Sequence, residues 1–140
     1  MSTAKTYSRF TSEGKVRPDD IDMFQHVHNS KYLDYVLAAR YEQMETAYGM
    51  SMEQFMAEGY GWVVKTAHVN FIRPLNLGET FTVTTGIESI NEKGARVSYE
   101  IVSLKTGKVS SDGWCDYVLI DLKTGRSRTL TEEMIKKYSI

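Results

Sequence analysis

Acidic and histidine side chains gather between Arg17 and Arg40, in the segment RPDDIDMFQHVHNSKYLDYVLAAR, just where a helix is expected to begin. Backbone N–H groups in the first turn of a helix lack partners and carry about half a positive charge, so they can stabilise a developing oxyanion. A carboxylate beside them can act on the same carbonyl group as a base or a nucleophile. Asp22 is the predicted catalytic residue. The alternative is that Asp22 only forms a turn or caps the helix.

The neighbouring acids and histidines have simpler interpretations. Asp19 is expected to be a solvated turn residue, and Asp20 to order the loop through backbone hydrogen bonds. His26 and His28, two residues apart and close to an acid, resemble part of a divalent-metal site. The third histidine, His68, falls in an expected strand and is read more simply as a half-buried or pocket-lining residue. We therefore predict no metal site.

Composition narrows the class of protein. A chain of 140 residues, 41% hydrophobic and 25% charged, suits one soluble globular domain spanning 1–140. A net charge of -1 and a pI of about 6.3 argue against nucleic acid as a partner. The single Cys115 cannot form an internal disulfide, the first ten residues lack a signal-peptide pattern, and no run approaches the roughly 18 apolar residues of a membrane span. We expect a cytoplasmic protein without a membrane span.

The elements that must position Asp22 begin with one long helix. Asn29 is expected to cap a helix that continues to about Tyr48, with Gly49 as the left-handed residue at its end. The middle of this helix, residues 35–39, is apolar on nearly every face, which predicts burial all round. The spacing of Ser51 and Gln54 matches a capping box and predicts a short second helix.

A series of alternating segments predicts a sheet. Short links between them indicate an antiparallel meander, and Thr131 is expected to cap a short C-terminal helix. The fold class is therefore α+β, with a sheet curled around the long helix. Because such a sheet leaves free edges, we expect a homodimer or a dimer of dimers. The expected strands cover residues 7–16, 62–71, 81–90, 95–104 and 109–121.

The segment around Asp22 resembles a known family motif, approximately D-x-D-x-x-G-H-V-N-N-x-x-Y followed by A-R. The motif is that of the hotdog-fold acyl-CoA thioesterases, in the 4-hydroxybenzoyl-CoA thioesterase-like branch, and the later VNFIRPLNLGE resembles the family as well. The resemblance implies a hotdog fold, in which a curved antiparallel sheet of about five strands wraps around one long buried helix. It also implies a dimer, an acyl-CoA substrate and no cofactor. The matching residues are Asp20, Asp22, His26, Val27, Asn29, Tyr32, Ala39 and Arg40.

The resemblance also assigns roles at the site. It implies that Asp22 is the catalytic acid and that backbone N–H groups at the helix start, at His28 and Asn29, hold the thioester carbonyl. Direct attack by the carboxylate and activation of water both remain open. Two residues depart from the motif: Gln25 stands where the family has glycine, and His28 where it has the first asparagine.

Other residues are candidates for holding the substrate. The phosphates of CoA need Lys or Arg, and Lys93 and Arg96 beside the 91–94 turn are the first choices, followed by Arg73 and Lys65. Solvated surface charge explains each of them equally well. Arg40 is expected to pair with an acid beside the helix. Aromatic residues that could line an acyl pocket, or only pack in the core, are Tyr32, Tyr35, Tyr60 and Trp62.

Three functions from different classes remain open at this point. Hydrolysis of an acyl-CoA, or of an acyl-carrier-protein thioester, is favoured. A hotdog dehydratase would also handle acyl thioesters, but its proton shuttle pairs a histidine with an acid across the site. A non-catalytic acyl-CoA-binding dimer is the third reading, encouraged by the departures at Gln25 and His28. The sequence leaves the length and the aliphatic or aromatic class of the acyl group open.

Overall fold

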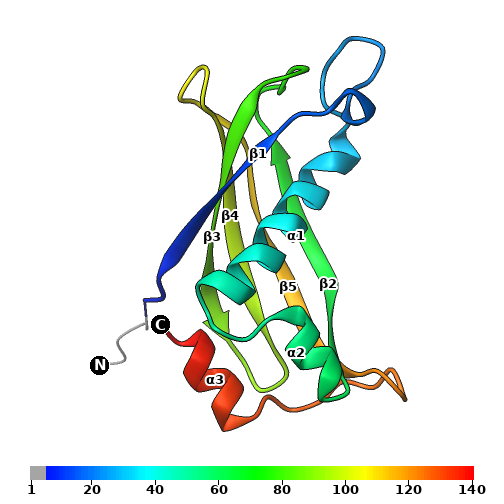
Figure 1. Ribbon diagram of the computed structural model, residues 1–140, viewed down its shortest axis with the longest axis vertical. Helices are drawn as coiled ribbons and strands as arrows, with labels where there is room; N and C mark the ends of the chain where they lie inside the picture. Colours follow the sequence, from blue (N-terminus) through cyan, green and yellow to red (C-terminus); the bar gives the residue numbers. More distant parts are fainter. Residues whose placement is uncertain (1–5) are drawn as a thin grey trace.

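A curved sheet holds helix α1 (Asn29–Thr46) against its concave face, as the computed structural model, which describes residues 6–140, shows (Figure 1). The sheet has five strands, all antiparallel to their neighbours. They are β1 (Arg9–Lys15), β2 (Tyr60–Phe71), β3 (Thr80–Ile90), β4 (Gly94–Ser103) and β5 (Val109–Asp121). The expected α+β class, with five strands around one long helix, is confirmed.

The order of the strands differs from a simple meander. It is β1-β3-β4-β5-β2, so β3, β4 and β5 follow one another as hairpins, while β2 lies beside β5 and not beside β3. The expected meander is therefore wrong for β2. The reason is that residues 72–79, which include Pro74, form a long connection across the end of the sheet and not a tight hairpin turn. The two edges of the sheet are β1 and β2.

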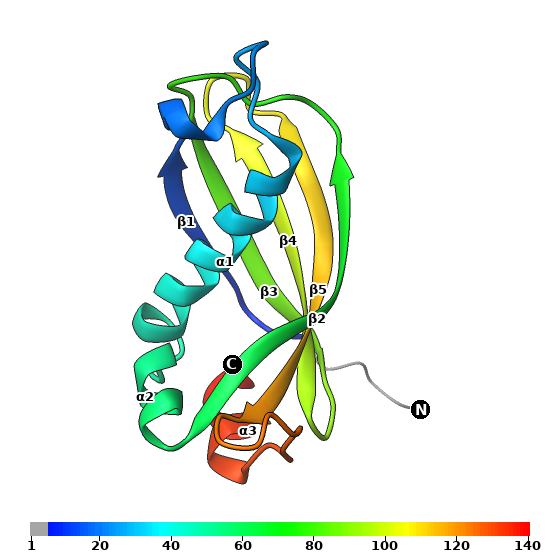
Figure 2. The ribbon, with the colours of Figure 1, turned by 90° about the vertical axis from the view of Figure 1, so that its right-hand side faces the viewer.

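Helix α1 is buried on one face only. Its buried residues include Tyr32, Val36 and Ala39, whereas Leu37 and Tyr41 on the other side are 37% and 45% exposed. The expectation of burial all round is wrong for this chain, because the sheet curls around one side of the helix and leaves the other side open (Figure 2).

The ends of the helices follow local rules with one correction. His28, and not Asn29, is the N-cap of α1, and its side chain makes no capping hydrogen bond. Gly49 has the expected left-handed conformation, with φ of 72°. The capping box at Ser51 is present and begins α2 (Met52–Ala57), and Thr131 accepts the Met134 N–H to begin α3 (Glu132–Tyr138). No helix within residues 6–140 is long and apolar enough to cross a membrane.

The core between the sheet and α1 divides into two clusters. One surrounds the first half of α1 and includes Leu75, while the other lies under α2 and α3 and includes Phe55 and Met134. Cys115 faces the concave side of β5 and is completely buried. Burial raises the pKa of this thiol to about 11.

Candidate active site

A short loop precedes α1 at the end of the sheet where β1 and β2 finish (Figure 1). The loop closes on itself, because Ile21 pairs with Val27 and the Asp22 N–H donates to the His26 carbonyl at 2.8 Å. His26 in turn pairs with Asn76 in the connection between β2 and β3. These contacts fix the shape of the loop that carries Asp22 and leads into α1.

The Asp22 carboxylate has one oxygen in use and one without a partner. Oδ1 accepts the backbone N–H groups of Phe24 at 2.8 Å and His26 at 3.2 Å. No hydrogen bond to Oδ2 occurs within residues 6–140, and the residue is half-buried. Asp22 therefore forms the turn that the simpler interpretation expected, and its second carboxylate oxygen is left without a partner in the described part of the chain.

The backbone conformation at Gln25 explains why the motif has glycine at this position. Its φ is 64°, in the left-handed region that residues with a Cβ rarely adopt. Its N–H donates to the Asp22 carbonyl at 3.0 Å, and its own carbonyl accepts the Leu77 N–H at 3.3 Å. The backbone shape required for this loop is kept despite the change from glycine.

The N–H groups at the start of α1 are not equally available. The His28 N–H donates to the Asp20 carbonyl at 2.9 Å. Among the described residues, the Asn29 and Ser30 N–H groups make no hydrogen bond. Of the two N–H groups expected to hold a carbonyl, only that of Asn29 is unpaired. The Ser30 N–H was missed, although counting the orphan donors of a helix that begins at Asn29 would have found it.

Asp20 orders the loop from beneath. It is 1% exposed, and its Oδ2 accepts the Tyr35 hydroxyl at 2.7 Å and the Arg17 N–H at 3.0 Å. Burial alone would raise the pKa of this carboxyl, but the hydrogen bonds from Tyr35 and Arg17 outweigh it and leave the pKa below its usual value. The predicted ordering role of Asp20 is confirmed. Tyr35, expected only as pocket or core surface, is part of it.

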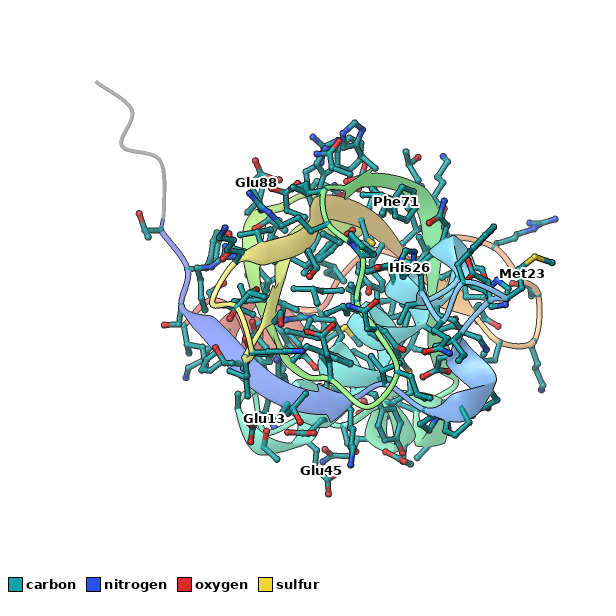
Figure 3. All side chains as sticks on the ribbon, turned by 90° about the horizontal axis from the view of Figure 1, so that it is seen from above. Glu13, Met23, His26, Glu45, Phe71 and Glu88 are labelled. Atoms are coloured by element: carbon teal, nitrogen blue, oxygen red, sulfur yellow. The ribbon has the colours of Figure 1, made fainter. Side chains whose placement is uncertain are left out.

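Large apolar side chains are exposed around this loop. Met23 and Phe24 at its tip are 89% and 72% exposed, and Phe71, Ile72 and Leu77 are also exposed. Viewed from above, Met23 points outward at the rim and His26 lies nearer the centre (Figure 3). Contiguous exposed apolar surface marks a site of interaction. We call these five residues the apolar rim.

The three histidines are not brought together. His68 lies on the outer face of the sheet, where its ring stacks on Trp114 with centroids 5.7 Å apart. His26 and His28 are exposed in the loop. Within residues 6–140, no group of three His, Cys, Asp or Glu side chains is placed to hold a metal ion.

The basic candidates lie at two different ends. Arg73 follows β2, at the same end as Asp22, and donates to the Val109 carbonyl at 3.0 Å. Lys93 is in the β3–β4 turn at the opposite end. Near that end, Arg96 binds both carboxylate oxygens of Asp116, at 2.7 and 3.0 Å. Of Arg73, Lys93 and Arg96, Arg73 alone lies near the end of its own chain that carries Asp22.

Arg40 has a different environment from the one expected. It is 7% exposed, and it donates to the Tyr48 hydroxyl at 3.2 Å and the Thr85 hydroxyl at 3.0 Å. No carboxylate of the described chain lies within 4.0 Å of it. The expectation that Arg40 pairs with an acid is therefore wrong. Of the four aromatic residues expected at an acyl pocket, Trp62 lines a cavity of about 500 Å³ that Arg40 also lines.

Comparison with known proteins defines the class. The family model of the thioesterase-like superfamily matches residues 16–137, so the chain belongs to that superfamily and is a thioester hydrolase. The long-chain acyl-CoA thioesterase FadM of Escherichia coli (strain K12) is 32% identical over 123 residues, which cover 88% of this chain and 92% of FadM.

Solved structures share the fold. YbaW from Escherichia coli is 29% identical, with a TM-score of 0.78, and the match covers 92% of this chain and 96% of YbaW. A DHNA-CoA thioesterase from Staphylococcus aureus is 19% identical, with a TM-score of 0.88 over 94% of this chain and 89% of the other. The hotdog fold implied by the motif is confirmed.

Proposed function

We propose that this protein hydrolyses fatty-acyl-CoA thioesters, with Asp22 as the catalytic carboxylate. The observation that carries the proposal is the free Oδ2 of Asp22 in the closed loop that leads directly into the unpaired N–H groups at the start of α1. A thioester needs little more than a positioned nucleophile and an oxyanion site, because its thiolate is a good leaving group. The identity to FadM supports a fatty-acyl substrate over an aromatic one.

The residues divide the reaction between them. In the general-base route, Asp22 takes a proton from water while the water oxygen attacks the thioester carbon. The Asn29 N–H, with Ser30 beside it, stabilises the negative oxygen of the tetrahedral intermediate. Collapse of that intermediate breaks the C–S bond and releases the CoA thiolate and the free acid. In the nucleophilic route, Asp22 attacks first, and water then hydrolyses the mixed anhydride.

The loop supports either route by fixing the carboxylate. Two backbone N–H groups hold Oδ1, so Oδ2 keeps one direction relative to the helix start. Asp20, locked by Tyr35 and Arg17, holds the base of the loop.

The substrate site is proposed to be completed by a second copy of the chain. β2 is a twelve-residue edge strand, and the apolar rim at its end is exposed. Such an edge favours pairing, and antiparallel pairing of two β2 edges would reverse the second copy. The β3–β4 turn of one copy would then lie at the Asp22 end of the other. In that arrangement Lys93 and Arg96, as well as Arg73, remain candidates for the CoA phosphates. Light scattering checks this, and a monomeric mass contradicts it.

The catalytic proposal is tested by CoA release from short, medium, long and aromatic acyl-CoAs. Asp22→Asn keeps an oxygen for the Phe24 and His26 N–H groups and removes the charge, so the loop should keep its shape. We expect kcat to fall at least about a hundredfold, the scale of losing a catalytic base. The matched control is Asp19→Asn, the same change at an exposed position whose ion pair within residues 6–140 is with Arg17, and it should retain activity.

Two results contradict the proposal. An unimpaired Asp22→Asn variant would exclude Asp22 as the catalytic group. Absence of turnover on every substrate, with acyl-CoA binding intact, would indicate the non-catalytic alternative.

A further inference from the structure

Residues 75–77, in the connection between β2 and β3, lie as a short strand against residues 25–27 of the loop that carries Asp22. The two segments form an antiparallel bridge at His26 and Asn76, and a backbone hydrogen bond flanks this bridge on each side. These bonds run from the Val27 N–H to the Leu75 carbonyl at 2.9 Å and from the Leu77 N–H to the Gln25 carbonyl at 3.3 Å. The shape of the loop therefore depends on where the connection lies.

The backbone of His26 joins this short strand to the Asp22 carboxylate. The His26 N–H donates to Oδ1 of Asp22 at 3.2 Å, and the His26 carbonyl accepts the Asp22 N–H at 2.8 Å. A displacement of residues 25–27 would therefore turn the carboxylate. It would also move the start of α1, where the unpaired N–H groups of Asn29 and Ser30 follow directly in the chain.

Glu79 fixes the connection from its other side. Its Oε2 accepts two hydrogen bonds from Asn76, one from the backbone N–H at 2.7 Å and one from the side-chain amide at 3.0 Å. Its Oε1 accepts the Ser103 hydroxyl at 2.7 Å. Ser103 is the last residue of β4, the central strand of the sheet. One carboxylate thus ties the turn that contains Asn76 to the middle of the sheet.

The charge of Glu79 strengthens this tie. Burial of the half-buried side chain would raise the pKa of its carboxyl, but the hydrogen bonds from Ser103 and Asn76 outweigh burial and lower the pKa. The group is therefore ionised at neutral pH. Hydrogen bonds to an ionised acceptor are roughly twice as strong as those between neutral groups.

We propose that Glu79 is a positioning residue for the thioesterase reaction, which sets the direction of the Asp22 carboxylate through Asn76 and residues 25–27. This inference rests on the proposed function, because it takes Asp22 as the catalytic carboxylate. A misplacement of about 1 Å at a reacting group can lower the rate about a hundredfold. Glu79 makes no hydrogen bond to Asp22 or to the start of α1, so its effect is carried by the backbone between them.

Kinetics of Glu79→Ala test the proposal, since this change removes all three side-chain hydrogen bonds. We expect kcat per folded molecule to fall at least about tenfold and KM to stay within about threefold, because the candidate phosphate-binding residues do not contact Glu79. The matched control is Glu13→Ala, the same change at an exposed residue of β1 whose side chain makes no hydrogen bond or ion pair within residues 6–140. It should leave both constants unchanged. An unaltered kcat in folded Glu79→Ala would reduce Glu79 to a structural role and overturn the proposal.

Glu79→Gln separates the hydrogen bonds from the charge. Its amide oxygen can accept from Asn76, and its NH₂ group can donate to the Ser103 hydroxyl, so kcat should stay within about threefold of the wild type. A loss as large as that of Glu79→Ala would show that the charge of Glu79, and not its geometry, affects the reaction, and would overturn the positioning role.

Amide NMR resonances report on the loop without turnover. The N–H groups of Phe24 and His26 donate to Oδ1 of Asp22, so their chemical shifts follow the position of that carboxylate. We expect Glu79→Ala to shift both resonances, and Glu79→Gln and Glu13→Ala to leave them in place. Unshifted resonances in Glu79→Ala would show that the loop keeps its shape without Glu79 and would contradict the proposal.

A double-mutant cycle with Asp22→Asn tests whether Glu79 acts through Asp22. Adding Glu79→Ala to Asp22→Asn should lower kcat by less than about threefold, because the carboxylate that Glu79 positions is already lost. An equal fall in both backgrounds would overturn the proposal. The two failures are distinguishable: an unimpaired Asp22→Asn variant refutes the proposed function, whereas an impaired Asp22→Asn with an unimpaired Glu79→Ala refutes only the role of Glu79.

Discussion

The two ends of α1 differ in how their buried polar groups are paired. At its start, most polar groups are paired: Oδ2 of Asp20 accepts from Tyr35 and Arg17, and the His28 N–H has the Asp20 carbonyl. Oδ1 of Asp20 makes no hydrogen bond within residues 6–140, but it lies 3.6 Å from the Arg17 guanidinium. At its other end, Arg40 and Tyr117 leave donor groups unpaired beside an open cavity. The difference teaches that the start of the helix holds its polar groups in fixed positions, whereas the other end leaves open space beside them. One helix supplies both because its ends face different parts of the core.

The largest expected effect tests how tightly each end is packed. Leu75 is completely buried beside the start of α1, and Leu75→Ala should lower the free energy of unfolding by about 2–5 kcal/mol. Met134 is also buried but borders the cavity, so it already lacks contacts on one side. Met134→Ala should therefore cost less, near the lower limit of that range. Urea unfolding of both variants measures the difference, and equal losses would contradict the contrast in packing.

A smaller effect tests the satisfied polar groups at the helix start. Asp20→Asn removes a charge that two hydrogen bonds stabilise, and it should lower the free energy of unfolding by about 1–3 kcal/mol at neutral pH. Because the folded pKa of Asp20 is below its unfolded value, its contribution is present above about pH 4 and is lost as the pH falls through the folded pKa.

The wild type and the Asp20→Asn variant should therefore converge in stability as the pH is lowered. Unfolding curves measured from neutral to acid pH check this. A difference between the two proteins that stays constant below pH 4, or grows there, would show that the pKa of Asp20 is not lowered by folding.

The smallest expected effect concerns Gln25. A residue with a Cβ in this left-handed conformation lowers the stability of the fold by roughly 1 kcal/mol. Glycine removes this strain, but it also increases the conformational entropy of the unfolded chain, which offsets part of the gain in stability. Gln25→Gly should change the free energy of unfolding by less than about 1 kcal/mol and leave kcat unaltered. Gln25→Val, with a branched Cβ, should be clearly destabilised in the same thermal unfolding measurement. A large loss in the glycine variant would mean that the Gln25 side chain itself holds the loop.

Local patterns predicted much of this fold. Alternation placed β3 to β5 within about one residue at each end, and the capping patterns at Ser51 and Thr131 marked two short helices correctly. The pairing of β2 with β5 was not predictable in this way. Strand order depends on contacts between residues far apart in the sequence, and alternation along one strand carries no information about which strand lies beside it.

The candidate site was predictable where a motif constrains the backbone and not elsewhere. The loop around Asp22 was found because its residue types are fixed by chemistry and by the turn. The partner of the His28 N–H and the surroundings of Arg40 were not found, since both depend on contacts across many residues. A lone arginine in a helix does not reveal whether its partner is an acid, a hydroxyl or a cavity.

Cys115 gives the molecule an internal reporter of its own unfolding. It is the single cysteine of the chain and is completely buried in β5, with its pKa raised to about 11 by burial. Thiol reagents attack the thiolate, so the folded protein should be inert to them, whereas the unfolded chain, with a pKa of about 8.5, should react. The rate at which Cys115 is labelled therefore measures how often the centre of the sheet opens. For the same reason, a thiol reagent added to the folded enzyme should record released CoA with little background from the protein.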